Sequence, residues 1–416
     1  MLSRRSLGAV IEEGRIPGGK LFPRPFYLQQ FAPFIPRKEV LVLTGVRRSG
    51  KSTLMRLLMR ELLDSGVASI ESAGYVNLED YRLSESLTPD LLGQILTQFK
   101  RPGRRAFLFM DEIQAIPGWE KWARTVHDSM GDRVKIIVSG SNASLLGKDY
   151  STLLTGRNIT FRIAPLSYLE YLNFGKTAKP TLSDYLEFGG FPEVVLAEEH
   201  DIKRRLLRQY FEDIVNKDVI NRHSIRNTRQ VHTLARFLAA NPGQKTSFNK
   251  LAKTFGFKST DTVIRYAQYL KDTFLVHEVP FHSYSIQVRH DPSRLPKYYV
   301  CDNGFIGILE DPISKDHGRR MENAAYLSIR PRGEITYWSD GKQEVDFITG
   351  QVAINVTTST KPLEREVRGL VELARVDRQI RRKLLVTPQP VPQSGIEMVE
   401  PERFLTDSDK MIPDVS

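Results

Sequence analysis

The feature that most constrains the fold is the stretch Gly45-Val46-Arg47-Arg48-Ser49-Gly50-Lys51-Ser52, a complete GxxxxGKS pattern. It follows the apolar run KEVLVLTG (38–45), which predicts a buried strand. It opens KSTLMRLLMRELLDSG (51–66), whose leucines recur at helical spacing. A glycine-containing turn between a strand and a helix presents backbone N–H groups to an anion, and the helix N-terminus adds its positive dipole end. The pattern therefore predicts a phosphate-binding loop.

We expect residues from all parts of this loop to contact the phosphates of a nucleotide. In this interpretation the Lys51 ammonium reaches the outer phosphates, and the Ser52 hydroxyl ligates Mg²⁺. A chance match in a turn is the alternative, and the flanking strand and helix argue against it. The stretch Asn216-Lys217-Asp218 lacks the spacing of a guanine-specific motif, so ATP is favoured over GTP. The expected nucleotide-binding set is Gly45, Arg47, Arg48, Ser49, Gly50, Lys51, Ser52 and Thr53.

A second motif closes the apolar run RRAFLFMDEI (104–113) with two acids, Asp111 and Glu112. A buried strand would deliver Asp111 to the hydration shell of Mg²⁺, and Glu112 would polarise the attacking water as a general base. The alternative is an acidic strand end that holds no metal. The order and spacing of the two motifs favour the catalytic interpretation.

A third polar element, Ser139-Gly140-Ser141-Asn142, ends the apolar run 134–142. If this strand lies between the two motif strands, Ser141 or Asn142 stands beside the γ-phosphate as a sensor. The sequence does not choose between them, and ordinary turn residues are the alternative. Arg157 is a candidate arginine acting on that phosphate in cis or in trans, unless it is a solvated side chain at a loop end. The expected catalytic set is Lys51, Glu112, Asn142 and Arg157, and the expected metal ligands are Ser52 and Asp111.

The alternation of apolar runs and helical patterns places the first 165 residues in the α/β class. Strands are predicted at 74–80 and 134–142 as well as at the two motif runs. Because these runs are apolar throughout, we expect a parallel sheet covered on both faces. Ligands bind beyond the carboxyl ends of the strands in such sheets, and the three polar elements all fall there. Residues 166–225 look helical, with a break at Gly189-Gly190-Phe191-Pro192.

The composition of the chain indicates in which cellular compartment it works and what kind of partner it attracts. The chain has 416 residues, and 60 Lys and Arg against 49 Asp and Glu give a formal net charge of +11. Its single cysteine, Cys301, allows no disulfide within the chain, which fits a reducing compartment. The sequence has no run of about 18 apolar residues, and its basic N-terminus is a poor signal peptide. We therefore expect a cytoplasmic protein with no membrane span, and the basic excess invites a polyanionic partner.

The chain resembles a family of prokaryotic AAA+-like P-loop ATPases that carry a C-terminal domain of winged-helix and restriction-endonuclease-like character. The motifs that carry the resemblance are GVRRSGKSTLMRLL, FMDEIQAIPGWEKW, VSGSNASLL, LLTGR, PLSYLEYL and YLEFGGFPE. It implies an ATPase core over 1–165, a helical lid over 166–225, a winged helix over 226–300, a degenerate restriction-endonuclease-like domain over 301–390 and a tail over 391–416. It also suggests a ring of identical chains, although a monomeric switch fits equally well.

Residues 247–300 predict the winged helix in more detail. Its first helix is expected over 247–254, and Ser259 is a natural cap for a second helix to about Lys271. A wing is expected at 277–299, with Arg289 and Arg294. Arg, Thr and Tyr on the second helix suit contacts to double-stranded DNA, and protein contact or domain packing is the alternative. Val263, Ala267 and Leu270 are expected inside, and Lys258, Thr260, Thr262, Arg265, Tyr266 and Tyr269 outside.

The last module resembles a restriction-endonuclease-like site that lacks part of its chemistry. Glu322 on a helix and Asp346 on a strand match the family's metal-binding acids, and Glu344 lies nearby. The next strand places Asn355 and Thr357 where the family has an acid and a lysine. Asparagine is a weak neutral ligand and threonine carries no charge, so we expect no nuclease activity.

Two further expectations concern the C-terminal end. A long basic helix is expected over 363–385, and Arg365, Arg368, Arg375 and Arg382 would share one face, either solvated or in contact with phosphates. Residues 388–416 hold several prolines and six acids against two bases, so we expect loose order there.

The leading functional hypothesis is an ATP-driven switch that binds DNA through the winged helix. A nucleotide-gated switch that contacts only protein is the alternative, and an active metal-dependent nuclease is the third.

Overall fold

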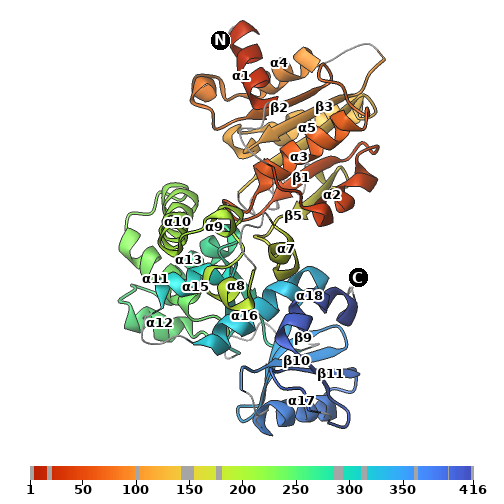
Figure 1. Ribbon diagram of the computed structural model, residues 1–416. Coiled ribbons are helices and arrows are strands. Elements are labelled where there is room, and N and C mark those ends of the chain that lie inside the picture. The colour runs from red at the N-terminus through yellow and green to blue at the C-terminus, as the bar shows by residue number, and fades with distance from the viewer. Residues whose placement is uncertain are drawn as a thin grey trace. The chain divides into compact units, whose positions relative to one another are not determined.

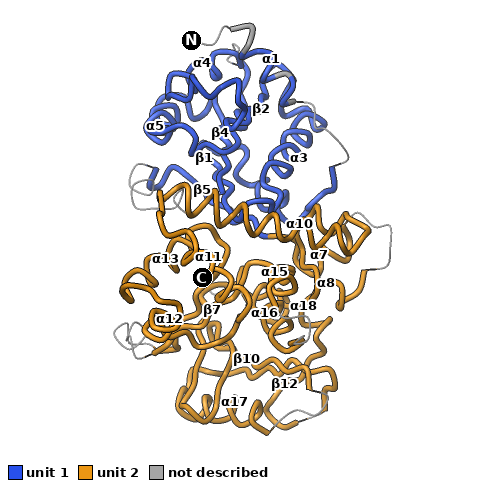
Figure 2. Tube along the Cα trace, turned by 90° about the vertical axis from the view of Figure 1, so that its left-hand side faces the viewer, with its two compact units in different colours: residues 1–164 blue, residues 165–416 orange. Residues whose placement is uncertain are grey.

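The chain folds into two compact units, residues 1–164 and 165–416 (Figure 2). The structure, a computed structural model, describes residues 4–15, 21–99, 103–141, 154–174, 180–283, 294–310, 316–359, 364–391 and 393–413. None of the described helices is both long and apolar enough to pass through a bilayer. Each unit is described below by itself.

The first unit is built on a five-stranded sheet in the order β2-β3-β4-β1-β5, and every neighbouring pair is parallel (Figure 1). The strands are β1 (Val40–Thr44), β2 (Ala73–Asn77), β3 (Ala106–Asp111), β4 (Val134–Gly140) and β5 (Asn158–Arg162). The predicted α/β fold and parallel sheet are confirmed, and β4 lies between β1 and β3. The edge strand β5 was not predicted, because its residues are only partly buried and mix polar with apolar side chains.

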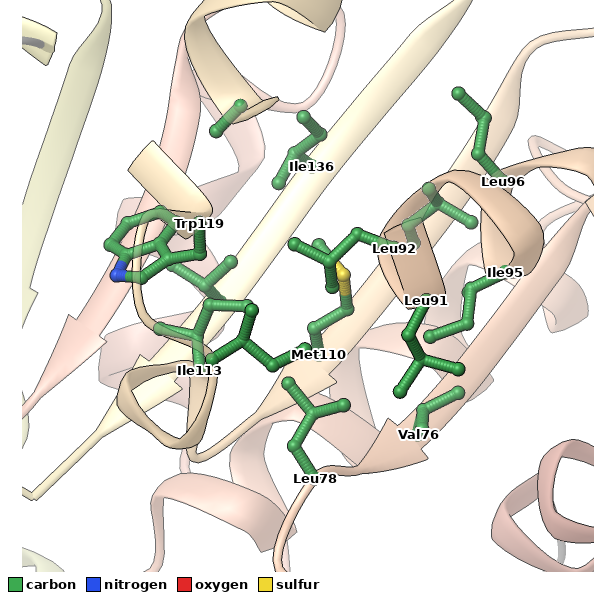
Figure 3. Packing of buried hydrophobic residues seen from close by; sticks show 14 of the residues in the cluster. Val76, Leu78, Leu91, Leu92, Ile95, Leu96, Met110, Ile113, Trp119 and Ile136 are labelled. Carbon is green, nitrogen blue, oxygen red and sulfur yellow. The ribbon is translucent and has the colours of Figure 1, made fainter. Parts of the chain in front are cut away.

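Helices cover both faces of this sheet because successive strand residues point to opposite sides. Leu108 and Met110 of β3 join a cluster with α1, α4 and α5, whereas Phe107 and Phe109 join another with α2 and α3. Figure 3 shows the first cluster, in which Trp119 and Leu92 lie over Met110 and Ile136. The helices are α1 (Arg4–Arg15), α2 (Pro25–Phe31), α3 (Lys51–Asp64), α4 (Pro89–Phe99) and α5 (Trp119–Met130), with short turns η1 (Ala32–Phe34), η2 (Tyr81–Ser86) and η3 (Ile113–Ala115).

The second unit begins with the predicted run of helices. They are α7 (Tyr168–Asn173), α8 (Leu182–Phe188), α9 (Pro192–Leu196), α10 (His200–Asp213) and the π-helical segment η5 (Ile214–Asn221). The break between α8 and α9 falls at the predicted glycines. Gly189 has a φ of 72°, and a Cβ there would overlap the Asp302 carboxylate. That buried carboxylate accepts from the backbone N–H groups of Gly190 at 2.7 Å and Gly304 at 2.8 Å, and so fixes the break.

Three helices and a two-stranded antiparallel sheet follow. They are α11 (Thr228–Ala240), α12 (Phe248–Thr254), α13 (Thr260–Asp272), β6 (Val276–Val279) and β7 (Lys297–Val300). Ser259 caps α13 as predicted, and Ser247, expected as the first residue of a helix, caps α12 instead. The expectation that Tyr266 points outward is wrong, because its ring is buried and packs edge-on against Phe257. Arg289 lies outside the described residues.

The remainder of the second unit is a five-stranded sheet in the order β12-β11-β10-β9-β8 with helices around it. Its elements are α15 (Asn303–Leu309), α16 (His317–Ile329), η6 (Arg330–Arg332), β8 (Thr336–Ser339), β9 (Glu344–Thr349), β10 (Val352–Val356), α17 (Glu364–Val376), β11 (Arg382–Val386), β12 (Glu397–Val399) and α18 (Pro401–Met411). The predicted basic helix over 363–385 is wrong at its C-terminal end. The helix stops at Val376, and Arg382 begins a strand that pairs with β10.

The expectation of a loosely ordered tail is also wrong. β12 pairs with β11, and α18 buries Phe404, Leu405 and Met411 in the same cluster as Ile329 of α16. Four of the six acidic residues that suggested disorder are exposed, namely Glu397, Glu400, Glu402 and Asp409. Apolar spacing in this segment therefore outweighs its net negative charge.

Candidate active site

The phosphate-binding loop leaves β1 at Thr44 and enters α3 at Lys51. Gly45 has a φ of 150° and lies so close to the Ile163 carbonyl that no side chain would fit. Gly50 has a φ of 95° and forms the left-handed N-cap of α3. These two glycines supply backbone conformations and a close approach that other residues tolerate poorly. The loop therefore turns its backbone toward the start of α3, as an anion site requires.

The Lys51 side chain is held over this loop. It is 4% exposed, and its Nζ donates to the carbonyl oxygens of Gly45 at 3.0 Å and Val46 at 3.1 Å. These are neutral acceptors, with which phosphate oxygens compete well for an ammonium. The arrangement leaves the lysine at the loop, where outer phosphates would lie.

Asp111 sits at the carboxyl end of β3, on the same edge of the sheet as the loop. Its carboxylate is 2% exposed and accepts from the hydroxyl groups of Tyr75, at 2.5 Å, and Ser139. Ser52 lies near the same Tyr75 phenol, where it opposes the rise in pKa that burial and Asp111 cause. Tyr75 is therefore a common neighbour of the two predicted metal ligands, Ser52 and Asp111. The donor set of hydroxyl and carboxylate oxygens fits Mg²⁺.

Glu112 follows Asp111 in a left-handed conformation, with a φ of 55°. This turn redirects its side chain from the strand, and Ser139 accepts its backbone N–H at 3.1 Å. Burial raises the pKa of the Glu112 carboxyl, and the nearby Lys51 ammonium opposes that rise. The Gln114 amide donates to the carboxylate. A raised pKa and a fixed position suit a carboxylate that accepts a proton from water.

Two residues at this site carried no sequence signal. Tyr75 lies within β2, 36 residues before the aspartate that it contacts. Arg24 is 3% exposed and donates from one Nη1 to the carbonyl oxygens of Ser49, at 3.0 Å, and Ala164, at 3.1 Å. Only the folded chain brings them to the loop, and no local motif marks either one.

The structure does not bring Arg157 to the phosphate loop of its own chain. Its carbonyl accepts from the Val40 N–H at the amino end of β1, which is the edge of the sheet opposite the loop. Its guanidinium pairs with Asp128 at 2.7 Å. A role in cis is therefore unsupported, and a role in trans would need a second copy of the chain. Asn142 lies outside the described residues, and Ser141 is buried directly after β4.

The remaining members of the predicted nucleotide set lie on the loop or at its exit. Arg47 forms an ion pair with Glu79 at 3.7 Å, and Arg48 adopts a φ of 70°. Ser49 is fully buried, and Thr53 is exposed on the first turn of α3. These positions therefore follow one another along the loop and the first turn of α3.

A second surface of interest is basic and lies in the second unit, on and around α11, α12 and α13. Gln230 of α11 donates to the Gly256 carbonyl, and Thr260 of α13 donates to Asn249 of α12, so these segments lie together. Six exposed cations follow one another over this region, and none forms an ion pair with another described residue. They are Arg226, Arg229, Lys250, Lys253, Lys258 and Arg265. Unpaired cations on one short stretch suit a polyanion.

The fold and the first site define a P-loop α/β protein of the AAA type. A family model described as an AAA domain matches residues 37–172, which contain the loop, Asp111 and Glu112. A model for a domain of unknown function (DUF8612) matches residues 179–315.

An uncharacterized protein of Methanocaldococcus jannaschii, MJ1544, is 32% identical over 337 residues, which cover 76% of this chain and 72% of the relative. The chain belongs to the family of that archaeal protein. An uncharacterized protein of Haemophilus influenzae is 28% identical over 401 residues, covering 91% of this chain and 96% of its own.

Solved structures give weaker likenesses. Cdc6p of Pyrobaculum aerophilum is 11% identical, covers 72% of this chain and 96% of its own, and has a TM-score of 0.32. The RuvB Holliday junction branch migration motor of Thermotoga maritima is 17% identical, covers 67% of this chain and 88% of its own, and has a TM-score of 0.31. Likenesses of this size carry no argument below.

Proposed function

We propose that the chain is an ATP-binding and ATP-hydrolysing switch whose 226–300 region binds double-stranded DNA. The observation that carries the first half is the shared sheet edge. The loop after β1 and the Asp111-Glu112 pair after β3 meet there, and Ser139 of the intervening β4 hydrogen-bonds both acids.

The roles of the residues follow from these positions. Lys51 and the loop N–H groups bind the phosphates, and Ser52 and Asp111 hold Mg²⁺, which neutralises charge on the outer phosphates when bound. Glu112 accepts the proton of the attacking water. Ser139 and Tyr75 keep Asp111 in place, and Gln114 does the same for Glu112.

Replacement of the loop lysine tests the nucleotide site. We expect Lys51→Ala to lose ATP binding in an equilibrium assay with a fluorescent ATP analogue, because its ammonium is held over the loop by the carbonyls of Gly45 and Val46, where the outer phosphates would lie. Lys121→Ala, which removes an exposed lysine of α5 that has no ion pair among the described residues, is the matched control and should bind as the native chain does. Unchanged ATP binding and turnover by the pure Lys51→Ala protein would refute the assignment.

The DNA half of the proposal rests on the six exposed, unpaired cations of the α11–α13 region. Duplex DNA should bind more weakly as salt rises from about 50 to about 200 mM, because bound cations release counterions from the phosphates. A Lys253→Ala/Lys258→Ala/Arg265→Ala triple variant should weaken binding in a fluorescence anisotropy titration.

A control triple variant removes the same charge from α17. It is Arg365→Ala/Arg368→Ala/Arg375→Ala, whose arginines pair with Glu366, Glu364 and Glu372. It should bind DNA as the native chain does. Equal losses in the two triple variants would mean that general charge, and not this surface, attracts the DNA.

A nucleotide-gated protein-interaction switch without DNA binding is the second candidate function. One observation favours it: Ile264, at the centre of the outer face of α13, is 46% exposed. An exposed aliphatic side chain suits a protein partner better than a phosphate backbone. The same anisotropy titration separates the candidates, because a surface for protein alone gives no salt-dependent signal with duplex DNA.

We also propose that the 301–390 region has no metal-dependent nuclease activity. Asn355, where an acid would be needed, uses its amide on the backbone. Its oxygen accepts from Asp346 N–H, and its nitrogen donates to the carbonyls of Glu344 and Glu366. Mg²⁺-dependent cleavage of plasmid DNA that disappears in Asp346→Ala would overturn this proposal.

A further inference from the structure

Three carboxylates of the second unit converge on one buried lysine. The Lys297 Nζ of β7 lies 2.7 Å from Glu344 Oε1, 3.4 Å from Asp346 Oδ1 and 3.5 Å from Glu322 Oε1. The lysine side chain is 1% exposed. Glu344 and Asp346 belong to β9 and Glu322 to α16, so the cation joins three elements distant in sequence. This cluster is independent of the nucleotide site.

Each carboxylate in this cluster has a second partner. Tyr299 donates its hydroxyl to Glu322 at 2.7 Å, and the Val356 N–H donates to Asp346 at 3.0 Å. The half-exposed Lys245 pairs with Glu344 at 2.7 Å. Charged groups taken from water need this degree of pairing to be tolerated. Every carboxylate of the cluster therefore has a partner besides Lys297, and the two ammonium groups offset two of the three carboxylate charges.

The surrounding backbone closes the cluster on one side. Gly243, with a φ of 76°, packs against the Glu322 carboxylate so closely that a Cβ would overlap it. The Asn355 amide is turned away toward backbone groups, as described above. Among the described residues, no group of three or more His, Cys, Asp or Glu side chains is arranged to hold a metal ion.

An ammonium at this position supplies positive charge, as a metal ion would, but it binds the carboxylates by hydrogen bonds and not by coordination. Its three N–H donors match three carboxylate oxygens, whereas a divalent cation needs about six oxygens at 2.0–2.6 Å. A metal would have to share the site with a buried positive charge, which repels it, or displace that charge. We propose that Lys297 is the resident cation of the Glu322/Glu344/Asp346 site, and that the native chain therefore takes no divalent metal there.

The test is Mn²⁺ binding to the full-length chain without nucleotide, followed by electron paramagnetic resonance of the free ion. The native chain and Asp346→Asn should bind the same amount of Mn²⁺, because the native site is filled by the ammonium. Dependence on Asp346 separates this site from any ion bound near the phosphate loop.

Removal of the ammonium should open the site. We expect Lys297→Gln to gain one Mn²⁺ per chain, and Lys297→Gln/Asp346→Asn to lose it again. Lys245→Gln is the matched control, since it removes the other lysine on Glu344 but leaves Lys297 in place, and it should gain none.

Two results would overturn the proposal. One is Mn²⁺ binding by the native chain that falls by one ion in Asp346→Asn. The other is a Lys297→Gln protein with native circular dichroism that gains no ion. If Lys297→Gln fails to fold, the comparison of the native chain with Asp346→Asn decides the question alone.

Discussion

Each of the two units has a lysine beside carboxylates, but the lysines are used differently. Lys51 donates to neutral backbone carbonyls of its own loop, while Asp111 and Glu112 are held by the uncharged donors Tyr75, Ser139 and Gln114. Lys297 instead donates to all three carboxylates around it. The same residue types therefore give one site that can exchange its partners for a ligand and another whose carboxylates are already ion-paired with a buried lysine.

The exposed cations of the second unit show a similar contrast. The six cations named above around α11–α13 have no ionic partner among the described residues, whereas Arg236 of α11 and arginines of α17 and β11 are paired with glutamates at 2.7–3.3 Å. The pairing favours the solvated interpretation of the α17 face over a stripe that contacts phosphates. A count of charges along the sequence cannot distinguish these two surfaces, but their pairing does.

The largest expected effect concerns Glu112, in the candidate nucleotide site. Glu112→Gln should slow ATP turnover by about 10²–10⁴-fold, because the amide cannot accept the proton of water. ATP binding should persist, since Glu112 does not lie on the loop. Phosphate-release kinetics measure the first property and equilibrium binding the second, with exposed Glu85→Gln as control. Turnover within a few-fold of the native rate would remove Glu112 from the reaction.

Substitution of Lys297 should show its main effect in the stability of the fold. Lys297→Met leaves three carboxylates without their buried counter-ion and should cost about 3–5 kcal/mol in the free energy of unfolding. Lys245→Met, which removes a more exposed partner of Glu344, should cost about 1 kcal/mol or less. Urea unfolding followed by fluorescence compares the two. Equal costs would mean that the burial of Lys297 carries no special energetic weight.

Asp302 extends the comparison to a buried carboxylate held by backbone N–H groups, with no ion pair among the described residues. Burial raises its pKa from the usual 3.8 to about 7. A carboxyl whose folded-state pKa is raised destabilises the fold as pH rises through that pKa. Between pH 5 and pH 8 this linkage amounts to about 2–3 kcal/mol.

Asp302→Asn should therefore flatten the pH dependence of stability over this range. The measurement is the difference in unfolding free energy between the native chain and the variant at several pH values. A difference that does not change with pH would show that Asp302 stays ionised throughout.

Tyr75→Phe tests whether the neutral donor Tyr75 keeps Asp111 in position at the candidate nucleotide site. Loss of the hydroxyl leaves the buried Asp111 one donor short, which costs about 1–3 kcal/mol. We expect the Mg²⁺ concentration for half-maximal ATP turnover to rise about tenfold, a change that corresponds to 1.4 kcal/mol. Tyr81→Phe, at a phenol that is 83% exposed, should leave it unchanged. An unaltered Mg²⁺ requirement in Tyr75→Phe would limit the tyrosine to packing.

The smallest expected effect belongs to the unpaired cations. Lys258→Ala should lower the slope of log affinity for duplex DNA against log salt by about one. Arg375→Ala, at a paired arginine, should leave the slope unchanged. Equal slopes in the two variants would remove the distinction between paired and unpaired cations.

The sequence predicted the features that depend on local pattern. The strand, loop and helix over 38–66, the parallel sheet and the position of β4 between β1 and β3 all agree with the structure. Periodicity and glycine spacing determine these features within a few residues. The helix N-cap at Ser259 agrees for the same reason.

Local sequence patterns could not predict the long-range contacts or the residue at which some helices end. Tyr75, Arg24 and Lys297 meet their partners across 25 to 140 residues, and nothing near them in sequence marks the contact. The helix predicted over 363–385 contains neither glycine nor proline after Gly369, so no local signal announced its stop at Val376. Pairing with β10 draws the following residues into a strand, which is a tertiary effect.

The Arg24 bridge has a mechanical consequence. A single guanidinium nitrogen joins the Ser49 carbonyl in the phosphate loop to the carbonyl of Ala164, the last residue of the first unit. Gly45, the first residue of the loop, also abuts Ile163 with no room to spare. The phosphate loop is therefore tied to the last two residues of the first unit, so a ligand that displaces the loop has to break these hydrogen bonds or displace residues 163–164 with it.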